Sequence, residues 1–357
     1  MNLDDKKVFE KLDRHQVAKS IELLPDQMRQ VLESARLVKI PKEYKNVENV
    51  VLAGMGGSNL GIRIVRHLFS EQIKKPINIC AGYSVPNYVS KNTLYIISSY
   101  SGTTEEPLST YKEAKKRNAK IVAITEDSSK SKLKKIMIKD NLPGFVFKPD
   151  FNPSNQPRLG LGYSVFGIAV ILAKAGLIKI DTKEMQIIID KLELASRKWR
   201  VDSPSSRNLA KKVVSQLEDT SPILVGAEHL SGNLHVLRNQ INECAKTYSS
   251  YLMIPDMNHY AMEGLVKPDT NKENLTLVFF DSDLYDKRVA KRVQLTKQVA
   301  KKNKLKVVSV KLKGESKREQ CFEMLQLGSW LAYYLGIMYE FDPVAIPYVD
   351  WFKNNLK

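Results

Sequence analysis

The sequence predicts an α/β protein that consists of two doubly wound parallel sheets with flanking helices. Apolar runs of strand length alternate along the chain with helical segments of a dozen or more residues. Most of these runs are apolar at nearly every position, which is typical of parallel strands covered by helices on both faces. The length of 357 residues suits about two domains of this kind.

The first series of elements precedes residue 178. Residues 5–36 have apolar side chains at helical spacing and are expected to form helices. Residues 163–177, "YSVFGIAVILAKAGL", are apolar on most sides but too few to cross a bilayer, so they predict a buried helix. Strands are predicted at 49–55, 76–83, 93–100, 119–127 and 144–149, and helices at 58–72 and 104–117.

A second alternation follows, although no sequence repeat of fixed period is present. The stretch "KWRVDSPSS" (198–206) interrupts the pattern with proline and serine and predicts a domain boundary. We therefore expect a helical extension at 1–40, a first domain at 41–200 and a second domain at 201–357. In the second domain, strands are predicted at 222–229, 275–283 and 306–312, and helices at 231–247, 285–303 and 318–341.

Composition narrows the class of protein. The N-terminus is charged throughout, and Cys80, Cys244 and Cys321 lie far apart without metal or disulfide spacing. We therefore expect a cytoplasmic protein without a membrane partner. The net charge is +17, but the lysines are scattered, and zinc-finger, RNP and basic heptad patterns are absent from the sequence. No nucleic-acid partner is expected on these grounds.

The glycine-rich segment "VLAGMGGSNLG" (51–61) joins a predicted strand to a predicted helix. It does not fit a dinucleotide fingerprint, because the third glycine would have to replace Asn59 and the next strand ends without an acidic residue. It also lacks the Gly-Lys-Ser/Thr of a Walker loop. Gly56 and Gly57 permit close backbone approach, and the free N–H groups of a helix start suit an anion. The alternative is a tight turn with Ser58 as an ordinary N-cap.

A second turn, "SSYSGTTEE" (98–106), carries a surplus of hydroxyl groups. Thr103 and Glu106 have the spacing of a capping box, which leaves two serines and a second threonine without a role in the turn. Ligands of open α/β sheets bind at the carboxyl ends of strands near the switch point, so the two turns are predicted to face each other there. Neither turn contains lysine or arginine. We therefore predict a neutral cradle that holds a phosphate as a handle.

Together, "GMGGSNLG" and "SSYSGTTEE" resemble the loops of the SIS (sugar isomerase) domain, which binds phosphosugars. In that domain, the serines and threonine of these loops hold the sugar phosphate. The resemblance implies that the phosphate contacts in this chain are Gly57, Ser58, Ser99, Ser101 and Thr104.

Isomerisation of an aldose phosphate also needs a base and a group that stabilises the enediolate. Glu243 in helix 231–247 is directed away from the apolar residues of that helix, and the alternative is a solvated glutamate near Lys246. Arg158 lies in a Pro/Asn/Gly-rich loop before the apolar helix, where an arginine usually has a partner. The alternative for Arg158 is a loop-capping role.

Ring opening needs a further acid–base group. His259 follows an apolar segment in "IPDMNHYAMEG" (254–264), and histidine titrates near neutral pH. The alternative is a surface histidine, and His235 is a lesser candidate. Lys353, in the terminal "VDWFKNNLK", is a second candidate cation, with a frayed tail as its alternative.

These pieces also occur in the order of a more specific family. With "NQPRLGLGYS", "NQINECAK", "MNH" and "VDWFK", roughly residues 40–357 resemble the bifunctional phosphoglucose/phosphomannose isomerases of the SIS superfamily. The resemblance implies a homodimeric isomerase without a cofactor, in which Glu243 is the base and Arg158 stabilises the enediolate. It also implies that His259 and Lys353 assist ring opening, with His259 reaching the site of the neighbouring subunit.

Three departures from this family are visible. The histidine is followed by "YAMEG" where members have Asn-Glu, so Glu263 is a candidate replacement for the missing carboxylate. Thr103 stands where asparagine is common, and a basic extension precedes the first domain. The leading hypothesis is an enzyme that interconverts glucose 6-phosphate and fructose 6-phosphate, with mannose 6-phosphate as a further candidate substrate. The alternatives are a phosphosugar sensor without turnover and an isomerase of another phosphosugar.

Overall fold

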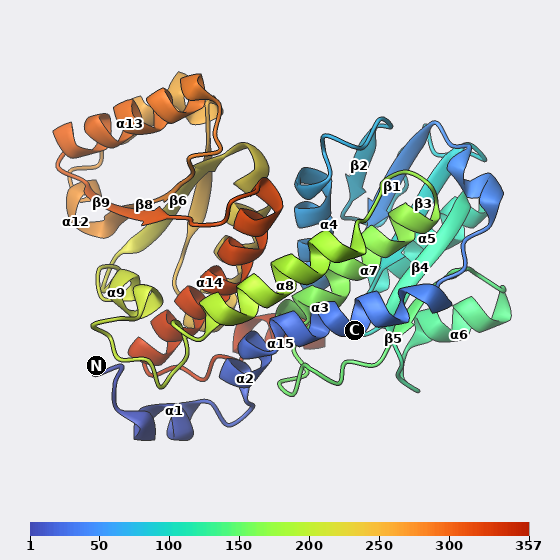
Figure 1. Ribbon diagram of the computed structural model, residues 1–357, viewed down its shortest axis with the longest axis horizontal. Helices are drawn as coiled ribbons and strands as arrows, with labels where there is room; N and C mark the ends of the chain where they lie inside the picture. Colours follow the sequence, from blue (N-terminus) through green and yellow to red (C-terminus); the bar gives the residue numbers. More distant parts are fainter. Residues whose placement is uncertain (357) are drawn as a thin grey trace. The chain divides into compact units, whose positions relative to one another are not determined.

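The chain forms two compact units in the computed structural model, which describes residues 1–356 (Figure 1). One unit comprises residues 23–190, and the other comprises residues 1–22 together with the chain from residue 191 onward. The division differs from the expected one. The expected extension 1–40 is shared between the two units, and the second boundary lies inside the helix α8 (Thr182–Ser196) rather than after residue 200.

The unit of residues 23–190 contains a sheet of five parallel strands in the order β2-β1-β3-β4-β5. All five strands were predicted, and every residue of β3 is buried, as expected for a strand with helices on both faces. Because β1 pairs with both β2 and β3, the switch point lies at the carboxyl ends of β1 and β3. The strands are β1 (Asn49–Ala53), β2 (Ile77–Cys80), β3 (Thr93–Ser98), β4 (Lys120–Glu126) and β5 (Gly144–Phe147).

Helices cover this sheet on both faces. Residues of α5 and α6 form one buried cluster with Val51, Tyr95 and Ala123 of the sheet. The helix α7 contacts β3, β4 and β5, and residues 161–172 of α7 are all buried, which confirms the predicted buried helix. The helices of this unit are α3 (Leu24–Ser34), α4 (Gly56–Leu68), α5 (Glu105–Lys116), α6 (Lys132–Lys139), α7 (Leu161–Lys174) and the first part of α8.

The other unit contains a second parallel sheet in the order β7-β6-β8-β9. Three of its strands were predicted, but β7 was not. β7 lies at the edge of the sheet, and Ile254 is its only buried residue. Its apolar run, 251–254, has only four residues and ends at Pro255, which is too short a pattern to distinguish a strand from a loop. The strands are β6 (Ser221–Ala227), β7 (Ser250–Ile254), β8 (Leu275–Asp281) and β9 (Lys306–Lys311).

The core of this unit is centred on α14, which is buried from Gln320 to Met338, apart from Glu323, and packs against α10. Figure 1 shows the strands β6, β8 and β9 between α13 and α14. No helix within residues 1–356 is long and apolar enough to cross a membrane. After α8, its helices are α9 (Leu209–Val214), α10 (Ser231–Ala245), α11 (Ala261–Gly264), α12 (Asn271–Asn274), α13 (Lys287–Lys302), α14 (Lys317–Met338) and α15 (Pro347–Asn355).

The first residues of the chain are part of the same core. They form α1 (Lys6–Leu12) and α2 (Val17–Glu22). The Lys211 side chain is fully buried, and its Nζ donates to the carboxylate of Asp4 at 3.1 Å and to two backbone carbonyls at 2.9 Å. Gln326 Nε2 in α14 donates to the Ile21 carbonyl at 2.9 Å. Residues 1–22 therefore pack as a strap on α14 and not as a separate extension.

Candidate active site

The glycine-rich turn lies where β1 ends and α4 begins. α4 begins at Gly56 with Met55 as its N-cap, so Ser58 is the third residue of the helix and the alternative of an N-cap serine is wrong. Gly56 has a φ of +49°, which favours glycine. Ser58 is buried, and its Oγ accepts a hydrogen bond of 2.7 Å from the backbone N–H of Tyr100. This bond joins the turn after β1 to the turn after β3.

The hydroxyl-rich turn after β3 has a different cap from the predicted one. α5 begins at Glu105, and its N-cap is Thr104, whose side chain makes no capping hydrogen bond. The predicted capping box of Thr103 and Glu106 is therefore wrong. Thr103 instead bonds within the turn, where its Oγ1 lies 3.0 Å from Ser101 Oγ. The helix begins too late for Thr103 to cap it.

The remaining hydroxyl groups of this turn are also paired. Ser99 Oγ donates to Thr104 Oγ1 at 3.2 Å. Ser99 is buried, whereas Ser101 and Thr104 are partly exposed. The chain reverses at Gly102, which has a φ of +66° and lies so close to Ser131 that a Cβ would meet its side chain at 1.8 Å. The turn therefore presents a compact group of hydroxyls at the end of β3.

The two turns are in contact at the switch point, as predicted. A Cβ on Gly54 would lie 2.9 Å from the carbonyl oxygen of Ser98, so only glycine allows the chain to leave β1 this close to β3. The parallel pairing of β1 with β3 places both turns at the same edge of the sheet. The structure thus brings the five predicted phosphate contacts to one edge: Gly57, Ser58, Ser99, Ser101 and Thr104.

Arg158 lies beside these turns. It belongs to the short helix η3 (Pro157–Leu159) and is buried, and its Nη1 donates to Gln156 Oε1 at 2.9 Å. A Cβ on Gly57 would lie 2.8 Å from the carbonyl carbon of Pro157 and 2.9 Å from Arg158 N. The backbone of Arg158 therefore rests directly on the start of α4.

Glu243 lies in the other unit, on α10. The predicted apolar face of this helix, formed by Leu234, Leu237, Ile241 and Ala245, is buried at every position, which confirms that part of the prediction. Glu243 itself is partly exposed, two residues before the end of the helix at Ala245. A rigid, packed helix thus carries this carboxylate at the margin of the core.

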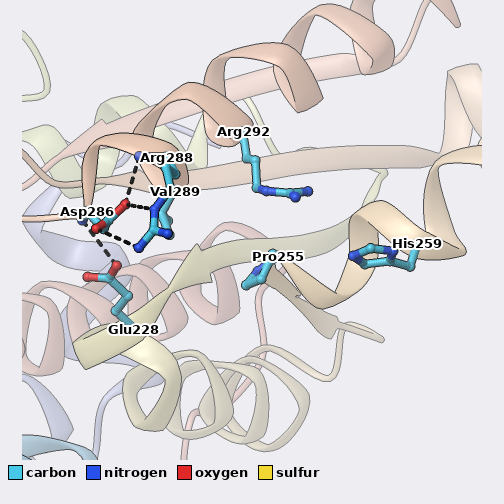
Figure 2. Close-up of a pocket in the computed structure, with 7 residues that line it drawn as sticks. All are labelled: Glu228, Pro255, His259, Asp286, Arg288, Val289 and Arg292. Atoms are coloured by element: carbon cyan, nitrogen blue, oxygen red, sulfur yellow. Dashed lines mark hydrogen bonds and ion pairs between the residues drawn. The ribbon is translucent and has the colours of Figure 1, made fainter.

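His259 lies in η5 (Asp256–His259) and is exposed. It lines a pocket of about 600 Å³ at the carboxyl ends of β6 and β7 (Figure 2). Asn258 Nδ2 donates to Thr296 Oγ1 at 2.8 Å, which attaches η5 to α13. The other lining residues are Glu228, Pro255, Asp286, Arg288, Val289 and Arg292.

Two arginines that were not predicted as site residues, Arg288 and Arg292, line this pocket. Arg288 Nε lies 3.0 Å from Asp286 Oδ1, and this hydrogen bond holds the pKa of Asp286 below its usual range. Figure 2 shows the Arg292 side chain leaving α13 and the His259 imidazole leaving η5 on facing sides of the pocket. The available signal was the four-residue spacing of the two arginines, which places both on one face of a helix.

The last two candidates are exposed. Lys353 lies in α15, a terminal helix without buried residues, and Glu263 lies in α11. Glu243, His259 and Lys353 all belong to the unit that includes the chain from residue 191 onward, whereas Arg158 and the phosphate contacts belong to the unit of residues 23–190. Across residues 1–356, no three His, Cys, Asp or Glu side chains are grouped to hold a metal ion.

Comparison with known sequences decides the family. The chain is 30% identical to the bifunctional phosphoglucose/phosphomannose isomerase of Caldicellulosiruptor bescii over 342 residues, which cover 94% of this chain and 98% of the relative. The chain belongs to the bifunctional phosphoglucose/phosphomannose isomerase family. Another member, from Aquifex aeolicus, is 26% identical and covers 89% of this chain and 93% of its own. Residues 206–356 match the bacterial phospho-glucose isomerase C-terminal SIS domain.

Solved structures agree with the fold of this family member. A hypothetical protein of Thermus thermophilus superimposes with a TM-score of 0.77 at 16% identity, over 98% of this chain and 92% of the other. The C-terminal domain of the glucosamine-fructose-6-phosphate aminotransferase of Francisella tularensis gives a TM-score of 0.71 at 12% identity, over 94% of this chain and 99% of the other. These similarities confirm the predicted fold class of two doubly wound parallel sheets with flanking helices, and the family model identifies residues 206–356 as a SIS domain.

Proposed function

We propose that this isomerase interconverts glucose 6-phosphate and fructose 6-phosphate, and accepts mannose 6-phosphate, by proton transfer through an enediolate. The observation that carries the proposal is the pair of contacting turns at the switch point, joined by the bond from Tyr100 N–H to Ser58 Oγ, with Arg158 beside them. The family relationship supports the same chemistry, since the curated relatives bear the name bifunctional phosphoglucose/phosphomannose isomerase.

In this proposal, the phosphate is a handle. The hydroxyls of Ser58, Ser99, Ser101 and Thr104 and the N–H groups around Gly57 hold its oxygens. Ser58 Oγ accepts the Tyr100 N–H, so its own proton remains to be donated to a phosphate oxygen. Binding energy from this remote group orients the sugar at the reacting carbons.

The chemistry is assigned to four side chains. Glu243 removes the proton from C2 of the open-chain aldose and returns it to C1, a role that contributes about 10²–10⁴-fold in rate. Arg158 stabilises the negative oxygen of the enediolate. His259 and Lys353 move protons during ring opening. No cofactor is assigned to these steps.

We also propose that the enzyme is a cytoplasmic homodimer, with His259 contributed to the site of the neighbouring subunit. The family resemblance implies this arrangement. The exposure of His259 supports it, because a residue that serves another subunit must be accessible on its own chain.

A coupled assay tests the proposal. Purified protein is given fructose 6-phosphate or mannose 6-phosphate, and glucose 6-phosphate is detected with its dehydrogenase and NADP. Turnover of both sugars supports the bifunctional isomerase. Binding of both sugars by calorimetry without turnover of either would instead establish the phosphosugar sensor, and turnover of neither with poor binding would favour a different phosphosugar.

A further inference from the structure

Tyr100 stands at the centre of the three loops that the proposed function uses. Its backbone N–H donates to Ser58 Oγ at 2.7 Å, which ties it to the turn after β1. Its neighbours in sequence, Ser99 and Ser101, are predicted phosphate contacts. Its side chain is buried, only 4% exposed, and its ring lies edge-on to Phe147 at 5.2 Å.

The hydroxyl of Tyr100 begins a chain of hydrogen bonds that leads to Arg158. Asn152 Nδ2 donates to Tyr100 Oη at 2.9 Å and to the carbonyl oxygen of Gln156 at 3.0 Å. Gln156 Oε1 then accepts the bond from Arg158 Nη1 at 2.9 Å. Asn152 is buried, and its own Oδ1 accepts from Ser154 Oγ at 2.9 Å, so the amide is held at both ends.

Close packing keeps this chain of bonds in place. A Cβ on Gly160 would lie 2.3 Å from the Tyr100 ring, so the loop that carries Arg158 rests on the ring itself. Burial raises the pKa of Tyr100, so the buried hydroxyl that accepts from Asn152 is neutral.

We infer that Tyr100 is a positioning residue for the isomerisation: through Asn152 and Gln156 it fixes the Arg158 guanidinium relative to the phosphate cradle. This inference rests on the proposed function, since it concerns how the group that stabilises the enediolate is held. In this role the Tyr100 side chain acts through Arg158 and not on the substrate. A misplacement of about 1 Å at a catalytic group is enough to cost up to about 10²-fold in rate, so loss of the link should reduce kcat.

Tyr100→Phe tests the inference, because it removes the hydroxyl and keeps the ring against Phe147 and Gly160. We expect kcat to fall about tenfold, with KM within about threefold of the wild type, since the backbone bond to Ser58 is retained. The matched control is Tyr111→Phe. Tyr111 is 5% exposed in the same unit and bonds through its hydroxyl to Asp140. Tyr111→Phe should lower the melting temperature by a few degrees, as Tyr100→Phe should. It should leave kcat within about twofold of the wild-type value.

A second variant and a double mutant separate positioning from general stability. The methionine side chain has nearly the same shape as that of glutamine but lacks the amide oxygen that accepts from Arg158. Gln156→Met should therefore reproduce the kcat loss of Tyr100→Phe. In an Arg158→Gln background, Tyr100→Phe should produce no further loss of kcat, because the group it positions is gone.

Several outcomes would overturn the inference. An unchanged kcat in Tyr100→Phe alongside a normal wild-type rate would show that the chain of bonds is only structural, and the proposed function would stand. A full additional loss in the Arg158→Gln background would show that Tyr100 acts on something other than Arg158. A wild type that turns over neither sugar would remove the proposed function and the inference together.

Discussion

The substitution Gly57→Ala tests whether the start of α4 and the Arg158 loop must be in contact. In Gly57→Ala, the new Cβ would lie 2.8 Å from the carbonyl carbon and from the Cβ of Pro157, and 2.9 Å from Arg158 N. Carbon atoms pack best at about 3.5–4.0 Å, so η3 has to retreat by about 0.7 Å or more. Most of the contacted atoms are backbone, which no rotamer change relieves.

Gly57→Ala should lower both the stability of the protein and its catalytic rate. Overpacking of this kind lowers the free energy of unfolding by about 1–3 kcal/mol. The same retreat displaces Arg158 from the phosphate cradle, so kcat/KM should fall about tenfold or more. The control is Gly82→Ala, where a Cβ meets nothing within 4 Å, and it should leave both quantities nearly unchanged.

Urea unfolding followed by circular dichroism gives the change in stability, and the coupled assay with fructose 6-phosphate gives kcat/KM. If Gly57→Ala matches Gly82→Ala in both measurements, the close approach of η3 to α4 has no energetic or catalytic meaning. Contact with α4 would then not be what holds Arg158 beside the cradle.

Three further predictions concern pH, the N-terminal strap and metals. Burial, together with the charges of Arg66 and Arg63, lowers the pKa of His67 from 6.5 to about 4. The contribution of neutral His67 to the free energy of unfolding is therefore present above pH 6.5 and is lost as the pH falls toward 4. His67→Gln should therefore recover about 2 kcal/mol of the stability that the wild type loses between pH 7 and pH 5, and equal losses in both proteins would exclude this cause. Lys211→Met leaves the Asp4 carboxylate and two backbone carbonyls without their buried donor, so it should lower the free energy of unfolding by about 2–4 kcal/mol. Limited proteolysis should then cleave residues 1–22 faster than in the wild type. Turnover should survive chelator, and loss of activity that zinc restores would contradict this expectation.

The sequence was sufficient for most of the fold because buried parallel strands are continuous apolar runs. β3, which is buried at all positions, was predicted from its run, whereas β7 was missed because its apolar run, 251–254, has only four residues. The N-terminal helices were predicted as helices, but their attachment was not. Their partner α14 lies about 300 residues away in the chain, as the hydrogen bond from Gln326 to Ile21 shows. Local sequence patterns do not predict contacts between segments this far apart.

The candidate site was also predicted only in part. Ser58, Ser99 and Ser101 were predicted because two turns of unusual composition follow predicted strands. Tyr100, in the middle of one of these turns, was overlooked because its partner Asn152 is 52 residues away and a tyrosine in a turn has no distinctive pattern. The capping box of Thr103 failed because the helix begins at Glu105, one residue later than that spacing requires.

In the proposed function, Glu243 moves a proton between C2 and C1 of a phosphosugar. Conversion of fructose 6-phosphate in D₂O, followed by NMR of the glucose 6-phosphate formed, tests it most directly when wild type and Glu243→Gln are compared. In D₂O, the wild-type product should carry deuterium at C2 to the extent that the proton on Glu243 exchanges with solvent before it is returned, and Glu243→Gln should lose both turnover and exchange by about 10²-fold or more. Turnover that persists at the wild-type rate in Glu243→Gln would contradict the assignment of Glu243 as the base.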